Sequence, residues 1–133
     1  MTFYFDRNFG WRFPEAVRAA RPPFAVEYHQ DRKNKFRFRP DAPDDEWLAK
    51  VAGEGWIVFS HDRKFHMLLP EISAVKQYKA GCFYLPGASS PTWDKTRYFM
   101  RAYEGIMDRI KLTAKPFIFE LSRAGRFRRI SIP

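Results

Sequence analysis

The alternation of short apolar runs with helical patterns constrains the fold of this 133-residue chain more than any other feature. The expected strands are Thr2 to Phe5, Phe24 to Tyr28, Trp56 to Phe59 and Cys82 to Leu85. The helical patterns between and after them cover Trp11 to Ala20, Asp44 to about Gly53, Pro70 to Ala80 and Thr92 to about Leu112. Such alternation is typical of a mainly parallel sheet with helices on both faces. The sequence therefore predicts an α/β fold of three α/β/α layers.

The C-terminal part of the chain, about residues 92–132, predicts the longest helix followed by a β-hairpin. The hairpin strands are Phe117 to Leu121 and Arg126 to Ile132, which flank a Ser-Arg-Ala-Gly turn. The helix carries a stripe of aromatic residues that we expect in the core: Trp93, Tyr98, Phe99 and Tyr103. A chain of this length ordinarily makes one domain, so we expect a single domain over 1–133, with its polar site within about 3–85.

The net charge of the chain limits the kinds of partner that it is expected to bind. Lys and Arg number 24 against 15 Asp and Glu, a formal net charge of +9, which favours polyanionic partners but is also compatible with solubility alone. The single cysteine, Cys82, excludes an internal disulfide framework and a zinc site built from several thiolates. No apolar run approaches the roughly 20 residues that span a bilayer. We expect a cytoplasmic protein with no membrane partner.

Three acids are expected at the same edge of the sheet. Asp6 follows the first strand, Asp62 follows the run Trp56 to Phe59, and Asp44 opens the helix that leads into that run. Carboxylates crowded at one edge repel each other and need a counter-ion, and Mg²⁺ or Mn²⁺ prefers carboxylate oxygen. An ion held there can activate water for attack on a phosphodiester. Taken one by one, Asp44 also fits a helix N-cap, and Asp6 and Asp62 fit turn or capping positions.

Residues beside these acids are candidates for supporting roles. Ser60 is placed to hydrogen-bond a site carboxylate, whereas His61 is expected to point away from Asp62 and to be structural. Asp45 lies within one turn of Asp44 and is a candidate fourth carboxylate. The candidates for holding substrate phosphates near the acids are Arg7, Asn8, Arg63 and Lys64.

The loop before Asp44 combines cations with aromatic residues. It contains Arg37 and Arg39 among five cations, interleaved with Phe36 and Phe38. Cations that grip phosphates and rings that stack on unpaired bases are typical of single-stranded RNA binding. The other interpretation is a solvated loop whose two rings pack inward. A second basic cluster surrounds the terminal hairpin and comprises Arg123, Arg126, Arg128 and Arg129.

Three stretches of the chain resemble the PIN-like domain family, and within it the VapC-type proteins. They are Phe-Tyr-Phe-Asp6-Arg-Asn, Pro43-Asp44-Asp-Glu-Trp47-Leu48, and Gly55-Trp-Ile-Val-Phe-Ser-His-Asp62-Arg-Lys-Phe65. The resemblance implies a divalent-metal-dependent endoribonuclease, often the toxin of a toxin–antitoxin pair, with Asp6, Asp44 and Asp62 as its acids. It also implies Mg²⁺ or Mn²⁺ as cofactor, RNA as substrate, an antitoxin protein as partner and a homodimer.

The chain departs from the family pattern at one point. Larger PIN domains supply a further acid from a helix between the first two acids, and here no acid of that interval has a comparable context: Glu15, Glu27, Asp31 and Asp41. This departure keeps a second interpretation open, in which the fold is catalytically inactive and serves as a nucleic-acid-binding or protein-interaction module.

Overall fold

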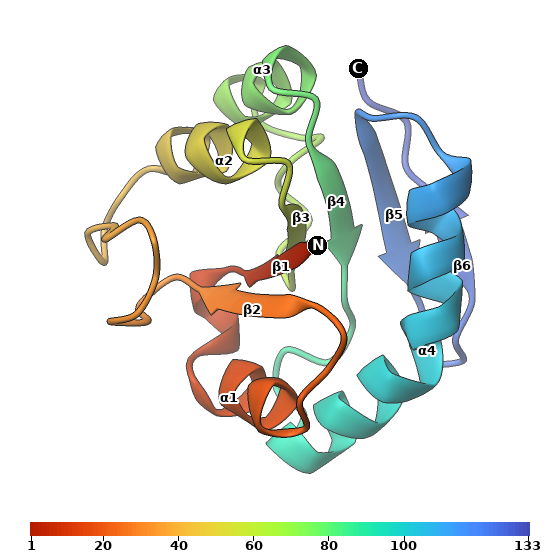
Figure 1. Cartoon of the computed structure of the whole chain (residues 1–133). Helices are drawn as coiled ribbons and strands as arrows, with labels where there is room; N and C mark the ends of the chain where they lie inside the picture. Colours follow the sequence, from red (N-terminus) through yellow and green to blue (C-terminus); the bar gives the residue numbers. More distant parts are fainter.

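The computed structural model describes residues 1–133 and contains one six-stranded sheet (Figure 1). Its strands are β1 (Thr2–Phe5), β2 (Ala25–Tyr28), β3 (Ile57–Ser60), β4 (Gly81–Tyr84), β5 (Phe117–Leu121) and β6 (Phe127–Arg129). Their order is β2-β1-β3-β4-β5-β6. Neighbours from β2 to β5 are parallel, whereas β6 pairs antiparallel with β5. The predicted mainly parallel sheet with a C-terminal hairpin is confirmed.

Four helices form the outer layers. They are α1 (Arg12–Ala19), α2 (Asp44–Gly53), α3 (Leu69–Gln77) and α4 (Thr92–Leu112), and a short 3₁₀ turn (Arg7–Phe9) follows β1. The buried residues of α1 and α4 pack in one core cluster, and those of α2 and α3 pack in another. Each cluster lies against a different face of the sheet, so the three-layer α/β/α arrangement is confirmed, and each helix begins and ends within a few residues of its predicted bounds.

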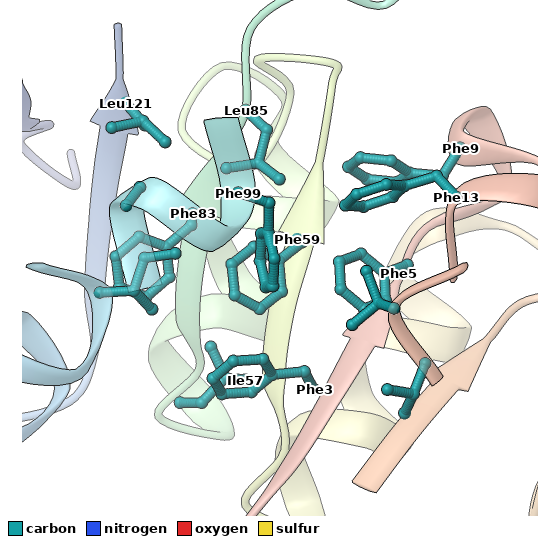
Figure 2. Packing of buried hydrophobic residues seen from close by; sticks show 14 of the residues in the cluster. Phe3, Phe5, Phe9, Phe13, Ile57, Phe59, Phe83, Leu85, Phe99 and Leu121 are labelled. Carbon is teal, nitrogen blue, oxygen red and sulfur yellow. The ribbon is translucent and has the colours of Figure 1, made fainter. Parts of the chain in front are cut away.

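The alternation of side chains along β1 shows how the sequence fills both layers. Phe3 and Phe5 join the cluster under α1 and α4, while Tyr4 between them joins the cluster under α2 and α3. The rings of Phe5, Phe59 and Phe83 form a row across three neighbouring strands (Figure 2). Strands whose side chains are buried on both faces are typical of parallel sheets. The core therefore packs β1 and β3 between the two helical layers, and the ends of these strands position the polar site.

One prediction about α4 is wrong. Trp93 was expected in the core, but its side chain is 72% exposed, whereas Phe99 is buried and Tyr98 and Tyr103 are partly buried. Trp93 is the second residue of the helix and precedes the part of α4 that packs on the sheet. Helical spacing therefore gives the correct face for α4 but not the point at which the helix first meets the core.

The chain reverses its direction of travel across the sheet beside β1. From β1 it moves outward through α1 to β2, and then returns through α2 to β3 on the other side of β1. In open α/β sheets, ligands bind outside the carboxyl ends of the strands at such a switch point. The two later connections, β3–α3–β4 and β4–α4–β5, step in the same direction across the sheet. Because α3 and α4 cover opposite faces of the sheet, the two crossover connections have opposite handedness.

None of the four helices combines the length with the apolar character that a membrane crossing requires.

Candidate active site

Asp6 lies at the switch point, directly after β1, and is completely buried. Its backbone N–H donates to the carbonyl oxygen of Phe59, which extends the pairing with β3 by one residue. Ser60, the last residue of β3, donates its hydroxyl to Asp6 Oδ2 at 2.8 Å, so the predicted contact of Ser60 with a site carboxylate is confirmed. Asp6 Oδ1 is buried and has no hydrogen-bond partner. A buried carboxylate oxygen without a donor is costly unless a cation or a donor reaches it.

Asp44 is the first residue of α2 and comes within reach of Asp6 through the loop after β2. Pro43 occupies the N-cap position, and no side chain caps this helix. The Asp44 Oδ1 atom instead accepts hydrogen bonds from Arg7 at 2.9 Å and from the indole N–H of Trp47 at 2.9 Å. The N-cap interpretation of Asp44 is therefore wrong. A carboxylate at a helix N-terminus also interacts favourably with the helix dipole.

Lys64 joins the two acids. Its ammonium nitrogen lies 2.9 Å from Asp6 Oδ2 and 3.0 Å from Asp44 Oδ1, and its side chain is only 13% exposed. Burial would lower the pKa of Lys64, but the negative charges of Asp6 and Asp44 outweigh burial and raise it. Burial would likewise raise the pKa of Asp44, but hydrogen bonds from Arg7 and Lys64 outweigh it and lower that pKa. The cluster therefore combines ionised groups of both signs.

The structure does not bring the third predicted acid into this cluster. Asp62 is exposed, and its backbone N–H donates to Ser60 Oγ at 3.0 Å. Asp45 is half-buried and makes no side-chain hydrogen bond or ion pair. No group of three or more acidic, histidine or cysteine side chains is arranged to hold a metal ion. The roles of Asp62 and Asp45 as metal ligands stay predictions.

The chemistry of the donor set nonetheless fits a divalent cation. Asp6 and Asp44 offer hard oxygen atoms, and Asp6 Oδ1 has no partner inside the protein. Mg²⁺ is commonly bound by only one or two carboxylates, with waters and substrate phosphates completing its shell. The position that both carboxylates face is filled by the Lys64 ammonium group, however, so an ion that uses both acids has to displace it.

His61 lies beside the cluster in a structural setting, as expected. Its Nδ1 atom lies 2.9 Å from the carbonyl oxygen of Leu85, and its ring packs on Phe9 with centroids 4.1 Å apart. Its backbone N–H donates to Asn8 Oδ1 at 3.3 Å. Burial lowers the pKa of His61 despite the bond to Leu85. Asn8 therefore supports the end of β3 in this arrangement.

Some of the predicted phosphate-binding cations have close partners within the protein, whereas others are exposed to solvent. Arg7 donates to the carbonyl oxygens of Pro40 and Ala42 as well as to Asp44, and so ties the loop to the acids. Arg63 pairs with Glu120 at 2.7 Å. Arg37 and Arg39 are exposed, and the only ion pairs of Arg39 are long contacts with Asp41 and Glu46, at 3.9 and 3.7 Å.

The aromatic residues of this loop do not form a platform for bases. Phe36 and Phe38 are half-buried and pack against the core cluster under α2 and α3. Phe38 lies edge-on to Tyr4, and Phe36 contacts Trp56. The interpretation in which both rings pack inward is therefore the correct one.

An open cavity of about 520 Å³ adjoins the cluster on the side of Arg7. Its lining includes the cations Arg7, Arg18, Arg32 and Lys33 and the indole of Trp11. It also includes two acids, Glu15 and Asp31, which both pair with Arg18. A second depression of about 470 Å³ shares His29 to Arg32 with it and continues to Arg37. Trp11 is 57% exposed. Sequence reasoning assigned Trp11 to a helix and missed it as a site residue, because only its exposure beside cations marks it out.

A model of the family described as "PIN like domain" matches residues 1–87, which include β1 to β4, α1 to α3 and the Asp6–Asp44–Lys64 cluster. No curated protein and no solved structure gives a significant match to the chain.

Proposed function

Since the match covers well over half of its length, the chain belongs to the PIN-like domain family, and on this premise we propose that it is a divalent-metal-dependent endoribonuclease. PIN-like domains are generally nucleases, so membership of the family by itself supports a nuclease-type module. The observation that carries the proposal is the pairing of buried Asp6 with Asp44 at the switch point of the sheet, since neither acid is used to cap a helix.

The residues of the cluster would have separate roles, some in binding the metal ion and others in orienting its ligands. Asp6 and Asp44 would hold Mg²⁺ or Mn²⁺, with Asp62 and Asp45 as further candidate ligands on the same edge. Such an ion supplies Lewis-acid polarisation of a phosphodiester and a nucleophile from bound water. Ser60 orients the Asp6 carboxylate through its 2.8 Å hydrogen bond. Arg7 orients Asp44 and fixes the loop that carries Arg37 and Arg39.

The basic cavity supports single-stranded nucleic acid as the substrate. Arg32 and Lys33 line it, and Arg37 lines the adjoining depression, so unpaired cations continue from one hollow into the next. An exposed indole such as that of Trp11 offers a flat face on which an unpaired base can stack. Asn8 and Arg63 lie at the same edge, and their contacts with phosphate are part of the proposal.

The proposed biological setting is a VapC-type toxin–antitoxin pair in the cytoplasm. In that setting an acidic segment of an antitoxin protein would dock on the basic hairpin, and a homodimer is the expected assembly. The hairpin supports this idea because Arg123, Arg126 and Arg129 are exposed, while Arg128 is paired with Glu120.

The test compares the wild type with Asp6→Asn in cleavage of single-stranded RNA, with and without Mg²⁺ or Mn²⁺. Asp6→Asn should abolish cleavage and relieve growth arrest on expression, whereas Asp108→Asn, an exposed change on α4, should leave both unchanged. Equal cleavage by Asp6→Asn and the wild type would refute the catalytic proposal. Asp62→Asn tests separately whether the third acid contributes.

Lys64 neutralises both acids through its ion pairs, and this observation favours one alternative. In it, the chain is a catalytically inactive PIN-like module that binds nucleic acid or another protein. In a binding module, charge reversal at Arg37 and Arg39 abolishes RNA binding and Asp-to-Asn changes leave it intact. Absence of RNA affinity at moderate salt would instead favour a protein-interaction role.

A further inference from the structure

The Lys64 ammonium group occupies the position that a cation shared by Asp6 and Asp44 would take. It lies about equally far from the two carboxylates, at 2.9 and 3.0 Å, and is almost excluded from solvent. The rings of Trp47 and Phe65 lie beside it, each with its centroid 5.7 Å from Nζ. Two negative groups and two aromatic rings thus hold one charge in a defined place.

An ammonium group and a divalent ion cannot share this position. Mg²⁺ lies about 2.0–2.1 Å from its oxygen ligands, so an ion between the two acids would overlap the space of Nζ. The carboxylate oxygens that Lys64 contacts, Asp6 Oδ2 and Asp44 Oδ1, are those turned toward the shared position. Repulsion between an ion and a lysine charge at contact distance adds to the steric conflict.

Lys64 is also attached to a segment that allows it to leave. It lies between the end of β3 at Ser60 and the start of α3 at Leu69. Its flexible four-carbon stem can carry the ammonium group toward solvent without a change in the sheet. Asp6 and Asp44 are held independently of Lys64, by Ser60 and by Arg7 with Trp47, so both acids keep their positions when the lysine moves.

We propose that Lys64 is a tethered counter-ion that competes with a divalent metal for the Asp6–Asp44 pair. In the metal-free protein it neutralises the two acids, and binding of the ion expels it. The inference rests on the proposed function in taking these two acids as the metal site. The metal affinity of the wild type is therefore lowered by the free energy needed to displace the lysine.

The test is Mn²⁺ binding by calorimetry to the wild type, to Lys64→Gln and to Lys64→Met. Both variants remove the competing charge and should bind Mn²⁺ about tenfold or more tightly than the wild type. Lys76→Gln is the matched control, since Lys76 is exposed on α3 and has no ion-pair partner, and its affinity should equal that of the wild type. Equal or weaker binding by both Lys64 variants would overturn the inference.

A measurement on the wild type covers the case in which these variants do not fold. The side-chain ammonium resonance of Lys64, slowed in exchange by burial, should be observable by ¹H–¹⁵N NMR and should disappear or shift as Mg²⁺ saturates the protein. A Lys64 resonance that stays unchanged at saturating Mg²⁺ would overturn the inference.

The outcomes separate this inference from the proposed function. Metal binding that is equal in the wild type and the Lys64 variants removes only the competition and leaves the metal site in place. Absence of Mn²⁺ binding in all variants, with RNA cleavage that needs no metal, removes the metal site itself and the inference with it.

Discussion

Replacing Phe99 with alanine tests whether α4 and the family-matched region fold as one unit. Phe99 lies on α4, beyond the matched residues 1–87, yet it is buried against the row of aromatic side chains on the sheet (Figure 2). Its ring centroid lies 5.6 to 6.4 Å from the rings of Phe3, Phe5, Phe13, Phe24 and Phe59. All five partners belong to the matched region, so this ring makes a large share of the aromatic contacts between the two parts.

The expected cost follows from this burial. Truncating a fully buried phenylalanine to alanine typically costs about 3–5 kcal/mol, and the several edge-on contacts place Phe99 in the upper part of that range. Total stabilities of domains are about 5–15 kcal/mol, so the loss is a large fraction of the whole. For a chain of this length it corresponds to a fall in Tm of about 10–18 °C. Alanine is a good helix former, so α4 itself does not oppose the change.

The assay is urea unfolding followed by far-UV circular dichroism and by tryptophan fluorescence. Of the four tryptophans, Trp47 on α2 and Trp56 pack in the core cluster on the other face of the sheet, whereas Trp11 and Trp93 are exposed. The fluorescence change on unfolding therefore reports mainly on a layer that Phe99 does not touch. Coincident curves with the full loss are expected for one folding unit. Met100→Ala, an exposed change on the same helix, should cost about 0.5 kcal/mol or less. A loss below about 1 kcal/mol for Phe99→Ala, or separate transitions, would refute the single-domain prediction.

Two further predictions concern pH and the basic cavity. Burial lowers the pKa of both His29 and His61, so the unfolded chain takes up protons before the native protein does as the pH falls below about 6.5. The free energy of unfolding should therefore be constant from pH 8 to 7 and fall below pH 6.5, by up to about 1.4 kcal/mol per pH unit for each histidine. Urea titrations at pH 7.5 and 5.5 measure this fall. A smaller fall in His61→Gln than in the wild type would assign part of the pH dependence to His61. Trp11→Ala should weaken binding of single-stranded RNA by about fivefold or more without changing Tm, as measured by fluorescence anisotropy, and unchanged affinity would exclude stacking on Trp11.

The sequence was sufficient for the architecture because the signals were local. The run Trp56 to Phe59 is uninterrupted and apolar, and the strand lies at Ile57–Ser60, buried on both faces. Asp6 and Ser60 were placed correctly relative to each other, since parallel neighbours bring their carboxyl ends to one edge. Strand alternation was enough to assign His61 to a structural position because it lies directly after β3.

The sequence also nominated Asp62, Lys64 and Asp44 for the site, but their surroundings could not be predicted. The strand ends at Ser60, so alternation does not determine the directions of Asp62 and Lys64, and the turn after β3 exposes the acid and buries the lysine. Helix position alone made Asp44 resemble an N-cap, but Arg7, Trp47 and Lys64, distant or on the next turn, take up its carboxylate. Such contacts depend on tertiary packing that a local pattern does not contain.

The charge balance of the cluster connects these contacts to the proposed chemistry. Asp6 and Asp44 face two cations, Lys64 and Arg7, so the cluster is neutral without a metal. A neutral cluster that is nearly closed to solvent attracts a phosphodiester weakly. Exchange of Lys64 for a divalent ion makes the same cluster positive and also releases an ammonium group beside it. The acidic pair would then change from a closed structural ion pair into a site for a phosphate, and the lysine that neutralises it would determine when that change occurs.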